Sequence, residues 1–354
     1  MIRAHIVGLE VRGFRRFQAG AKFEFRTPGN SPPDALIVAG PNGSGKSSFL
    51  ESILFALGRD HLLHRQLHGE HRLRWLRDAV TSNIHVSLRL HVASAPGTVL
   101  GTRTPLTLEI IRSTSGWSVS EAGESKPFSD DQNVIRSLLA DLPVEWFSSW
   151  RQPYLVGSTA PMSVQPDGIG DEMGRLWRVK QRIIDERTRG AFLRDSDGAG
   201  LTRDREWLDK LTKSWWALRG EDRSRFIVAA DPTDESERHF DIFLQRWISN
   251  DIGYDDVCPI DQLSSGELEW LALAGTLITD NSDGIVLVDE PELHLNPEWQ
   301  ARILPALRGV APTAQLIVAT HADAPWDQAY SFERLLLQPT ASADEELPNR
   351  GTAG

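Results

Sequence analysis

The sequence predicts an α/β fold with mixed sheets and a helical insertion, and three observations lead to this prediction. A glycine-rich stretch, GPNGSGKS at residues 40–47, stands between an apolar run and a stretch that can form a helix. Two further apolar runs, at 285–288 and 316–319, are each followed by polar or ionisable residues. Because buried parallel strands read as short continuous apolar runs, we expect these segments to be core strands whose carboxyl ends meet at one sheet edge.

Residues 40–47 match the phosphate-loop pattern G-x-x-x-x-G-K-[ST] in full. Glycines adopt backbone dihedrals closed to other residues, so successive N–H groups can converge on phosphates at the positive end of the next helix. Lys46 would place a charge on the phosphates, and Ser47 would offer its hydroxyl to Mg²⁺. The loop therefore predicts a site for a nucleoside triphosphate and Mg²⁺. The residues expected to form it are Gly40, Asn42, Gly43, Ser44, Gly45, Lys46, Ser47 and Ser48.

Two carboxylates, Asp289 and Glu290, follow the apolar run at 285–288. Ligands of open α/β sheets bind at the carboxyl ends of the strands, where this pair would lie. We expect Asp289 to hold Mg²⁺ and Glu290 to polarise the attacking water as a general base. The plainer alternative is that both residues only cap the next helix.

The pentapeptide LSSGE at residues 263–267 resembles the signature loop of ABC-type ATPases, whose common form is LSGGQ. The resemblance implies that Ser264, Gly266 and a helix beginning near Ser265 contact the γ-phosphate of ATP held by a second subunit. His321 stands 31 residues after Glu290 and corresponds to the switch histidine of this family, which senses the γ-phosphate. The resemblance thus adds His321 to Lys46 and Glu290 as catalytic residues.

Two further runs indicate the branch of the family. Residues 290–297, EPELHLNP, include the D-loop and resemble the EPExHLHP run of OLD-like ATPases, with Asn296 replacing the second histidine. Residues 6–17 resemble the opening strand-turn-strand of SMC, RecF and OLD-like ATPases, which implies that Arg15 lies near the nucleotide. The adjacent Arg16 is an equal alternative, and a solvated basic turn is the plain one. The resemblance implies a P-loop ABC-type ATPase head that binds ATP and Mg²⁺ as a head-to-tail dimer.

The spacing of the motifs supports this branch. Lys46 and Ser264 are 218 residues apart, which is intermediate between transporter ATPases and SMC chains with a long coiled coil. The segment 144–153 is expected to end a core strand, and it resembles the place of the family's Q-loop. Gln152 is therefore our candidate for the glutamine that contacts Mg²⁺. Gln66 and Gln132 are alternatives, and an ordinary loop amide is the plain interpretation of Gln152.

We expect four parts along the chain. Residues 1–169 would be the N-terminal part of the head, with the phosphate loop and a β-rich lobe, and 170–254 a helical insertion or arm. Residues 255–338 would be the C-terminal part of the head, and 339–354 a disordered tail.

Individual elements are expected within these parts. Strands are predicted over 83–121, and helices near 130–141, over 170–222 and over 234–250. The last of these helices would be amphipathic, with Phe240, Ile242, Phe243 and Trp247 among its apolar positions.

Composition favours a cytoplasmic protein without a membrane span. The sequence has no run of 18 apolar residues, and Arg3, His5 and Glu10 interrupt its N-terminus, which therefore lacks the apolar region of a secretory signal. The single cysteine, Cys258, excludes an internal disulfide. A net charge of −11 argues against nucleic acid wrapped over the whole surface, whereas arginines between 175 and 194 leave a local contact possible.

The leading hypothesis is an ATPase that regulates or powers a partner effector. The resemblance to stand-alone OLD-like ATPases implies a role in bacterial anti-phage defence, and the Septu and retron ATPases are examples of this class. Many OLD-like proteins carry a C-terminal Toprim nuclease domain, but only one more strand is expected here after His321. We therefore expect a nuclease or other effector to be supplied in trans. The alternative is a DNA-binding ATPase of DNA repair or chromosome maintenance. The spacing and the N-terminal run argue against the ATPase of a membrane transporter.

Overall fold

The computed structural model describes residues 2–63, 80–94, 105–124, 129, 131–149, 153, 155, 157–165, 174–197, 203–221, 223–233, 239–247, 254–280 and 283–338. The tail expected at 339–354 lies outside the described residues, as do Gln66 and Gln152.

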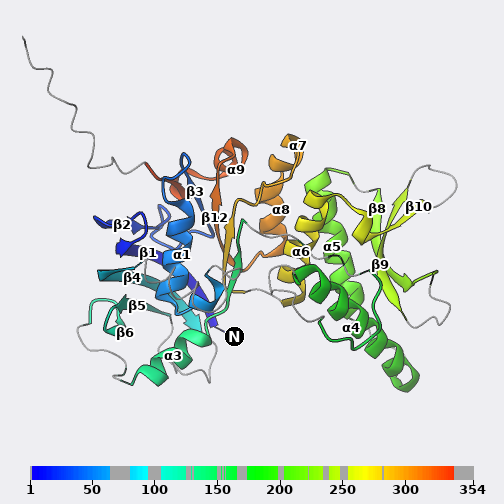
Figure 1. Cartoon of the computed structure of the whole chain (residues 1–354), viewed down its shortest axis with the longest axis horizontal. Coiled ribbons are helices and arrows are strands. Elements are labelled where there is room, and N and C mark those ends of the chain that lie inside the picture. The colour runs from blue at the N-terminus through cyan, green and yellow to red at the C-terminus, as the bar shows by residue number, and fades with distance from the viewer. Residues whose placement is uncertain are drawn as a thin grey trace, which may run out of the picture.

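A five-stranded parallel sheet runs through the middle of the molecule (Figure 1). Its strand order is β13-β3-β12-β11-β7, and every neighbouring pair is parallel. The sheet confirms the core strands that the apolar runs predict, and it places segments distant in sequence side by side. The strands are β3 (Ala35–Ala39), β7 (Val144–Phe147), β11 (Ile285–Asp289), β12 (Gln315–Thr320) and β13 (Arg334–Leu336).

An antiparallel sheet of order β2-β1-β4-β5-β6 covers one side of this parallel sheet. Helix α1 (Lys46–Ala56) lies between the two sheets, and α3 (Gln132–Ala140) packs against β6. Strands β4 to β6 and helix α3 confirm the elements predicted over 83–121 and near 130–141. The sheet comprises β1 (Ile2–Phe14), β2 (Ala21–Glu24), β4 (Val80–Ser94), β5 (Leu106–Ser113) and β6 (Gly116–Glu121).

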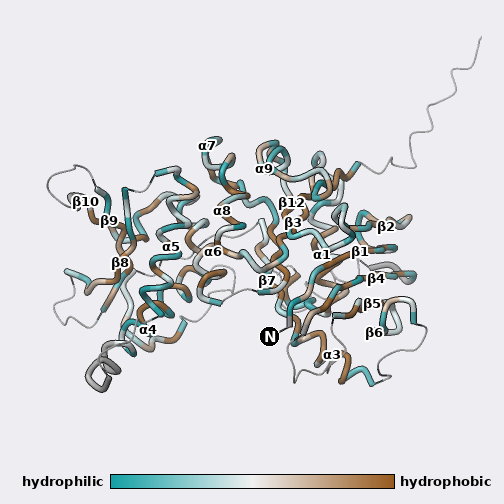
Figure 2. The backbone as a smooth tube through the Cα atoms, turned by 180° about the vertical axis from the view of Figure 1, so that it is seen from behind, coloured by the Kyte–Doolittle hydropathy of each residue, from teal (hydrophilic) through white to brown (hydrophobic). Residues whose placement is uncertain are grey.

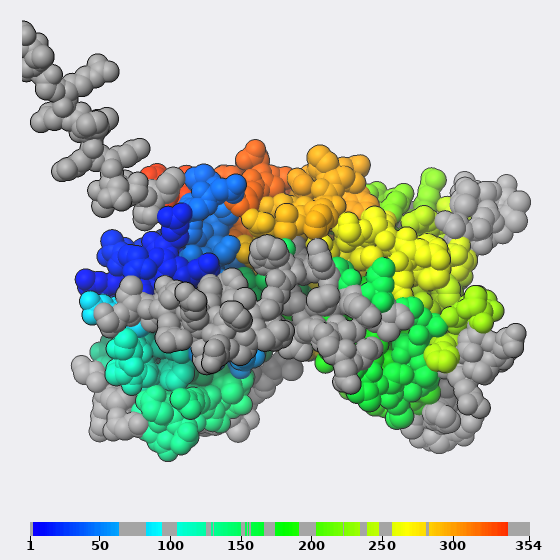
Figure 3. Space-filling model, in the orientation of Figure 1, coloured from blue at the N-terminus to red at the C-terminus, as the bar shows by residue number. Residues whose placement is uncertain are grey.

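A helical region covers the other side, so the two regions stand at opposite ends of the molecule in the ribbon and space-filling views (Figures 1 and 3). Helices α4 and α5 confirm the helical prediction for 170–222. The elements of this region are α4 (Arg175–Asp197), α5 (Arg203–Arg219), α6 (Ser265–Asp280), α8 (Ile303–Val310) and the antiparallel strands β8 (Ser224–Ala230), β9 (Phe240–Trp247) and β10 (Tyr254–Pro259). The described residues also form short helices: η1 (Asp60–Leu62), η2 (Ile260–Gln262), α7 (Pro297–Gln300), α9 (Asp323–Gln328) and η3 (Ser331–Glu333).

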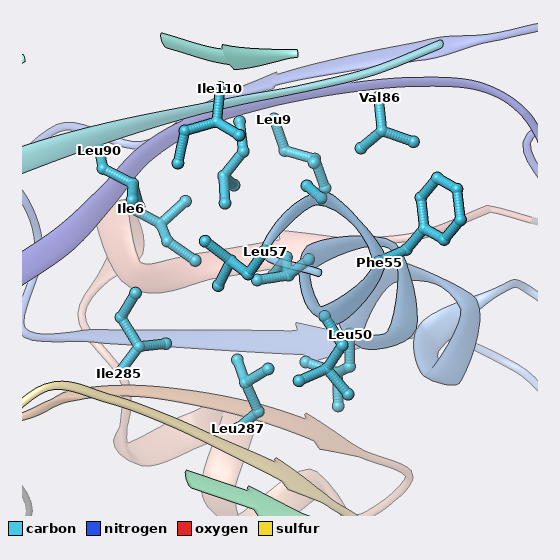
Figure 4. Close-up of a cluster of buried hydrophobic side chains, with 14 of the residues drawn as sticks. Ile6, Leu9, Leu50, Phe55, Leu57, Val86, Leu90, Ile110, Ile285 and Leu287 are labelled. Atoms are coloured by element: carbon cyan, nitrogen blue, oxygen red, sulfur yellow. The ribbon is translucent and has the colours of Figure 1, made fainter. Parts of the chain in front are cut away.

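The parallel sheet separates two hydrophobic cores because its side chains alternate between its faces. On β11, Ile285 and Leu287 join the core toward α1, whereas Val286 and Val288 join the core toward the helical region. Figure 4 shows Ile285 and Leu287 facing Leu50 of α1 and Ile6 of β1. Figure 2 shows the molecule from behind, coloured by hydropathy, and the parallel strands are largely hydrophobic. A sheet buried on both faces holds its strand ends, and the polar residues there, in fixed positions.

The helix expected over 234–250 is wrong, because β9 occupies residues 240–247 as the central strand of the sheet β10-β9-β8. Ile242 and Leu244, two residues apart, both enter the core toward the helices, whereas Phe243 between them does not. Hydrogen bonds to β8 and β10 on both sides override the helix-like spacing of the aromatic residues. The region 170–254 therefore contains strands as well as helices, and its boundaries as a domain remain a prediction.

None of the described helices combines the length and the apolar character that crossing a membrane requires.

Candidate active site

The phosphate loop joins the end of β3 to the start of α1. Gly40, Gly43 and Gly45 have φ angles of 153°, 76° and 101°, in the left-handed range that favours glycine. A Cβ atom on Gly40 would collide with the carbonyl oxygen of Leu337, so a side chain at this position would strain the backbone in two ways. The loop therefore has the backbone conformation and the glycines that close approach to phosphate requires.

A cavity of about 610 Å³ opens at this loop. Its lining joins the phosphate loop, the turn after β1 (Arg15, Arg16 and Gln18), and Glu290 and His321 at the ends of the core strands. The tips of β3, β11 and β12 meet here because the strands are parallel neighbours. One cavity therefore brings together residues from four distant segments that the sequence predicts to be functional.

Lys46 is buried inside this arrangement. Its Nζ donates hydrogen bonds to the carbonyl oxygens of Gly40 (2.8 Å) and Pro41 (3.1 Å) and lies 3.3 Å from Nδ1 of His321. Burial lowers the pKa of Lys46, and the charges of Glu290, Asp289 and Glu292 act in the opposite direction. A triphosphate in the cavity would compete with the loop carbonyls for this ammonium group.

Ser47 and Asp289 form the part of the site that fits a magnesium ion. The Ser47 Oγ donates to Oδ2 of Asp289 at 2.9 Å, which joins the first turn of α1 to the last residue of β11. A hydroxyl and a carboxylate are hard oxygen ligands of the kind that Mg²⁺ takes together with substrate phosphates. The expected third ligand, Gln152, lies outside the described residues. The alternative Gln132 exchanges hydrogen bonds with the backbone of Trp117 and does not line the cavity.

Glu290 and His321 are in direct contact. The Oε1 of Glu290 lies 2.7 Å from Nε2 of His321. Glu290 has a φ of 51°, and its N–H donates to the Ala319 carbonyl at 2.8 Å, so the chain turns sharply just after β11. Left-handed backbone at a residue other than glycine is strained and concentrates at functional sites. The turn directs the Glu290 carboxylate to the cavity beside the histidine.

The structure adds Glu292, a residue for which the sequence analysis assigned no role. One carboxylate oxygen, Oε1, accepts hydrogen bonds from Thr320 Oγ1 (2.6 Å), the His321 N–H (2.7 Å) and the Ala322 N–H (3.2 Å). Its side chain is buried. Glu292 therefore holds the backbone of His321 at the end of β12. In the sequence, Glu292 could have been identified by its place in the run EPELHLNP, two residues after Glu290.

Both arginines of the β1 turn lie at the cavity, but in different ways. Arg15, with a φ of 44°, forms an ion pair with Glu51 of α1. Burial lowers the pKa of Arg15, and the charge of Asp289 opposes this shift. Arg16 is exposed, and its Nη2 lies 3.0 Å from the position of a Cβ on Gly43. Arg15 thus braces α1, whereas the guanidinium of Arg16 lies over the phosphate loop.

Ser264 and Gly266 are not among the residues that line this cavity. Helix α6 begins at Ser265, as expected, and Ser264 is exposed just before it. A Cβ on Gly266 would lie 2.5 Å from the carbonyl oxygen of His294, so the signature loop packs directly on the D-loop. The Nδ1 of His294 lies 2.6 Å from Oε1 of Glu269 in α6 and strengthens this contact. We call the residues 264–269, together with 294–295, the signature face.

Comparison with family models matches two segments of the chain. Residues 176–324 match the family described as "AAA domain, putative AbiEii toxin, Type IV TA system". Residues 9–74 match a second family, described as "AAA domain". The two matches together include the phosphate loop, the signature loop, the acidic pair and His321.

Curated relatives match short parts of the chain. The Septu protein PtuA of Bacillus thuringiensis is 33% identical over 78 residues, which are 21% of this chain and 20% of that protein. The Retron Ec83 probable ATPase of Escherichia coli is 44% identical over 73 residues, which are 17% of this chain and 14% of that protein. The matched segments therefore span about a fifth or less of these relatives.

Solved structures match over nearly the whole chain. An Smc head bound to the C-winged helix domain of ScpA has a TM-score of 0.55 at 16% identity, covering 92% of each chain. An Smc head with an extended coiled coil, bound to the C-terminal domain of ScpA derived from Pyrococcus furiosus, has a TM-score of 0.51 at 14% identity and the same coverage. The fold of the chain is that of an SMC ATPase head.

Proposed function

We propose that this chain, whose fold is that of an SMC ATPase head, is an ABC-type P-loop ATPase that hydrolyses ATP with Mg²⁺ as a head-to-tail dimer. We further propose that this cycle regulates or powers a partner effector in anti-phage defence.

One observation carries the hydrolysis proposal: Lys46, Ser47, Glu290 and His321 converge on a single cavity, with Asp289 bonded to Ser47 beside it. In this proposal Ser47 and Asp289 hold Mg²⁺, which when bound supplies positive charge to the phosphate oxygens. Glu290 takes the proton of the attacking water as a general base. His321 keeps the Glu290 carboxylate in place through their 2.7 Å contact.

The dimer proposal is supported by the separation of the signature face from the cavity. Ser264 and Ser265 are exposed at the N-terminus of α6, a helix of 16 residues. Helix N-termini carry partial positive charge and unpaired N–H groups, which suit them to bind phosphate. Since Ser264 and Gly266 do not line the cavity of their own chain, we propose that they serve the ATP of a second copy.

The defence proposal draws on the named relatives, a Septu protein and a retron ATPase, whose similarity supports the same setting for this chain. The DNA-binding alternative receives less support from the arginines between 175 and 194. Among the arginines whose side chains the structure describes, ion pairs form between Arg175 and Glu145, Arg182 and Asp280, Arg187 and Asp204, and Arg189 and Glu186. Pairing reduces the positive charge available to a phosphate backbone.

The test is the solution mass of the Glu290→Gln variant with and without Mg-ATP. Loss of the general base should lower turnover at least about 100-fold while ATP remains bound. The mass should then double with ATP, and a second substitution, Ser264→Arg, should abolish the doubling by blocking the signature face. If the mass does not change with ATP, or still doubles in the double variant, the head-to-tail dimer is incorrect.

The effector proposal has a separate readout. A stable complex with a second protein, and turnover little changed by DNA, would support the defence role. DNA-stimulated turnover that disappears when the arginines between 175 and 194 are neutralised would favour the repair alternative.

A further inference from the structure

The signature loop of this chain carries an acidic residue, Glu267, where the common ABC form has glutamine. The Oε2 of Glu267 accepts hydrogen bonds from both the N–H and the Oγ of Ser264, each at 2.8 Å. The negative charge therefore stands directly beside the serine that we propose to meet a γ-phosphate. Because like charges repel, an unpaired carboxylate here would oppose the approach of a triphosphate.

Arg219, the last residue of α5, pairs with this carboxylate. Its Nη1 donates to the other oxygen of Glu267, Oε1, at 2.9 Å. The pair is largely shielded from solvent, with side chains 24% exposed for Arg219 and 10% for Glu267. Such shielded pairs are screened less by salt than surface pairs are. Arg219 therefore places a positive charge on the side of Glu267 opposite to its bonds with Ser264, while its Nε donates to the more exposed Glu221 at 2.7 Å.

Aromatic rings and a second arginine keep Arg219 in this position. Its guanidinium carbon lies 5.5 Å from the ring centroid of Trp215 and 5.4 Å from that of Trp299, which is within cation–π range. The Nη1 of Arg302 donates to the Arg219 carbonyl at 2.7 Å. Gly220, with a φ of 73°, leaves room for the Arg302 guanidinium, which lies 2.5 Å from where a Cβ would stand. Arg219 thus lies where α5, α6 and α7 meet.

We infer that Arg219 is a positioning residue of the signature face, which neutralises Glu267 so that Ser264 can approach the triphosphate of a second copy of this chain. The inference rests on the proposed head-to-tail function. It accounts for the departure from the common signature form, because a glutamine would bond Ser264 without needing a cation. It also gives the region that precedes the signature loop a part in the site.

The test is a double-mutant cycle in the Glu290→Gln background. The readout is the ATP concentration that gives half-maximal dimer by sedimentation. Arg219→Met should raise this concentration about tenfold when Glu267 is present, and by less than about threefold when it is combined with Glu267→Gln. Arg219→Lys, which keeps the charge, should fall between the parent and Arg219→Met.

The matched control is Arg205→Met, which removes the same charge from an exposed position of the same helix and should leave the ATP dependence unchanged. Binding of a fluorescent ATP analogue to monomeric protein shows that each variant retains its folded cavity. If Arg219→Met has no effect, or the same effect in the Glu267→Gln background, the positioning role is overturned while the dimer stands. If the Glu290→Gln parent never doubles in mass, the proposed dimer fails, and this inference fails with it.

Discussion

The cavity at the parallel sheet and the signature face are built from different kinds of structure. The cavity residues stand at the tips of strands and at the start of α1, held by a sheet that is buried on both sides. The signature face is assembled from helix ends and a turn, joined by polar contacts such as Arg219 with Glu267 and His294 with Glu269. The backbone of a strand tip is held by its neighbours in the sheet, so the side chains there have little freedom to move. A polar contact between two helix ends, by contrast, is lost when either partner is removed.

The two sites are linked by the residues 290–296. Glu292 holds the backbone of His321 on the cavity side, and the carbonyl of His294 lies against Gly266 on the signature face. A movement of residues 290–296 would therefore change the surroundings of His321 in the cavity and of Gly266 on the signature face. Each site is stabilised by its own contacts, while one segment connects the two. A substitution within one site should therefore leave the other site intact, whereas a substitution in residues 290–296 should disturb the link between them.

The largest effect is expected in the cavity. Lys46→Met removes the buried ammonium group that contacts the loop carbonyls and lies beside His321. Turnover should fall at least about 1000-fold, because a preorganised charge at the phosphates is lost from a partly desolvated site. Steady-state phosphate release and binding of a fluorescent ATP analogue measure this. Turnover within tenfold of the parent would mean that the cavity is not the hydrolysis site.

A smaller effect is expected from the connection, through Glu292→Gln. The amide oxygen can still accept from the His321 N–H, but the charge that strengthens the three hydrogen bonds is lost. We expect turnover to fall about tenfold, which corresponds to the free energy of one charge-assisted hydrogen bond, with ATP binding little changed. A loss of binding equal to the loss of turnover would contradict a role in placing His321.

The smallest effect on ATP binding is expected on the signature face, from Gly266→Ala. The added Cβ would stand 2.5 Å from the backbone carbonyl oxygen of His294, so unfolding free energy should fall by about 3 kcal/mol, the upper end of the range for overpacking. ATP binding to the monomer should persist, and ATP-dependent dimer should decrease. Denaturant unfolding checks the first effect and sedimentation the second. Gly309→Ala is the matched control, because a Cβ there meets no atom within 4 Å.

Much of the cavity could be predicted because its signals are local. An apolar run followed by Asp289 and Glu290 predicts a buried strand with carboxylates at its tip, and β11 has that form. The phosphate loop likewise carries its own strand, glycines and helix start. The parallel order of β3, β11 and β12 then makes the three tips neighbours. These local motifs, in their order along the chain, were sufficient to predict this part of the site.

The region after α5 shows where local signals fail. Residues 240–247 have aromatic residues at helix-like spacing, yet they form β9, because β8 and β10 satisfy its backbone on both sides. Strand pairing of this kind is decided by distant segments, which a local pattern does not report. Gln132, an alternative for the glutamine that contacts Mg²⁺, gives a second example. Its amide bonds the backbone of Trp117 on β6, a contact between two elements that the local sequence does not report.

The sequence by itself determined the fold class, the phosphate loop and the order of the motifs, because each depends on neighbouring residues and on the period of buried strands. Only the tertiary structure decided which polar groups meet: Glu292 with the His321 backbone, Arg219 with Glu267, and Arg16 over the phosphate loop. These partners are far apart in the chain, and the contacts form only when separate elements pack at a particular distance and angle. The physical reason is that hydrogen bonds and ion pairs act over a few ångströms of space, whatever the separation along the sequence.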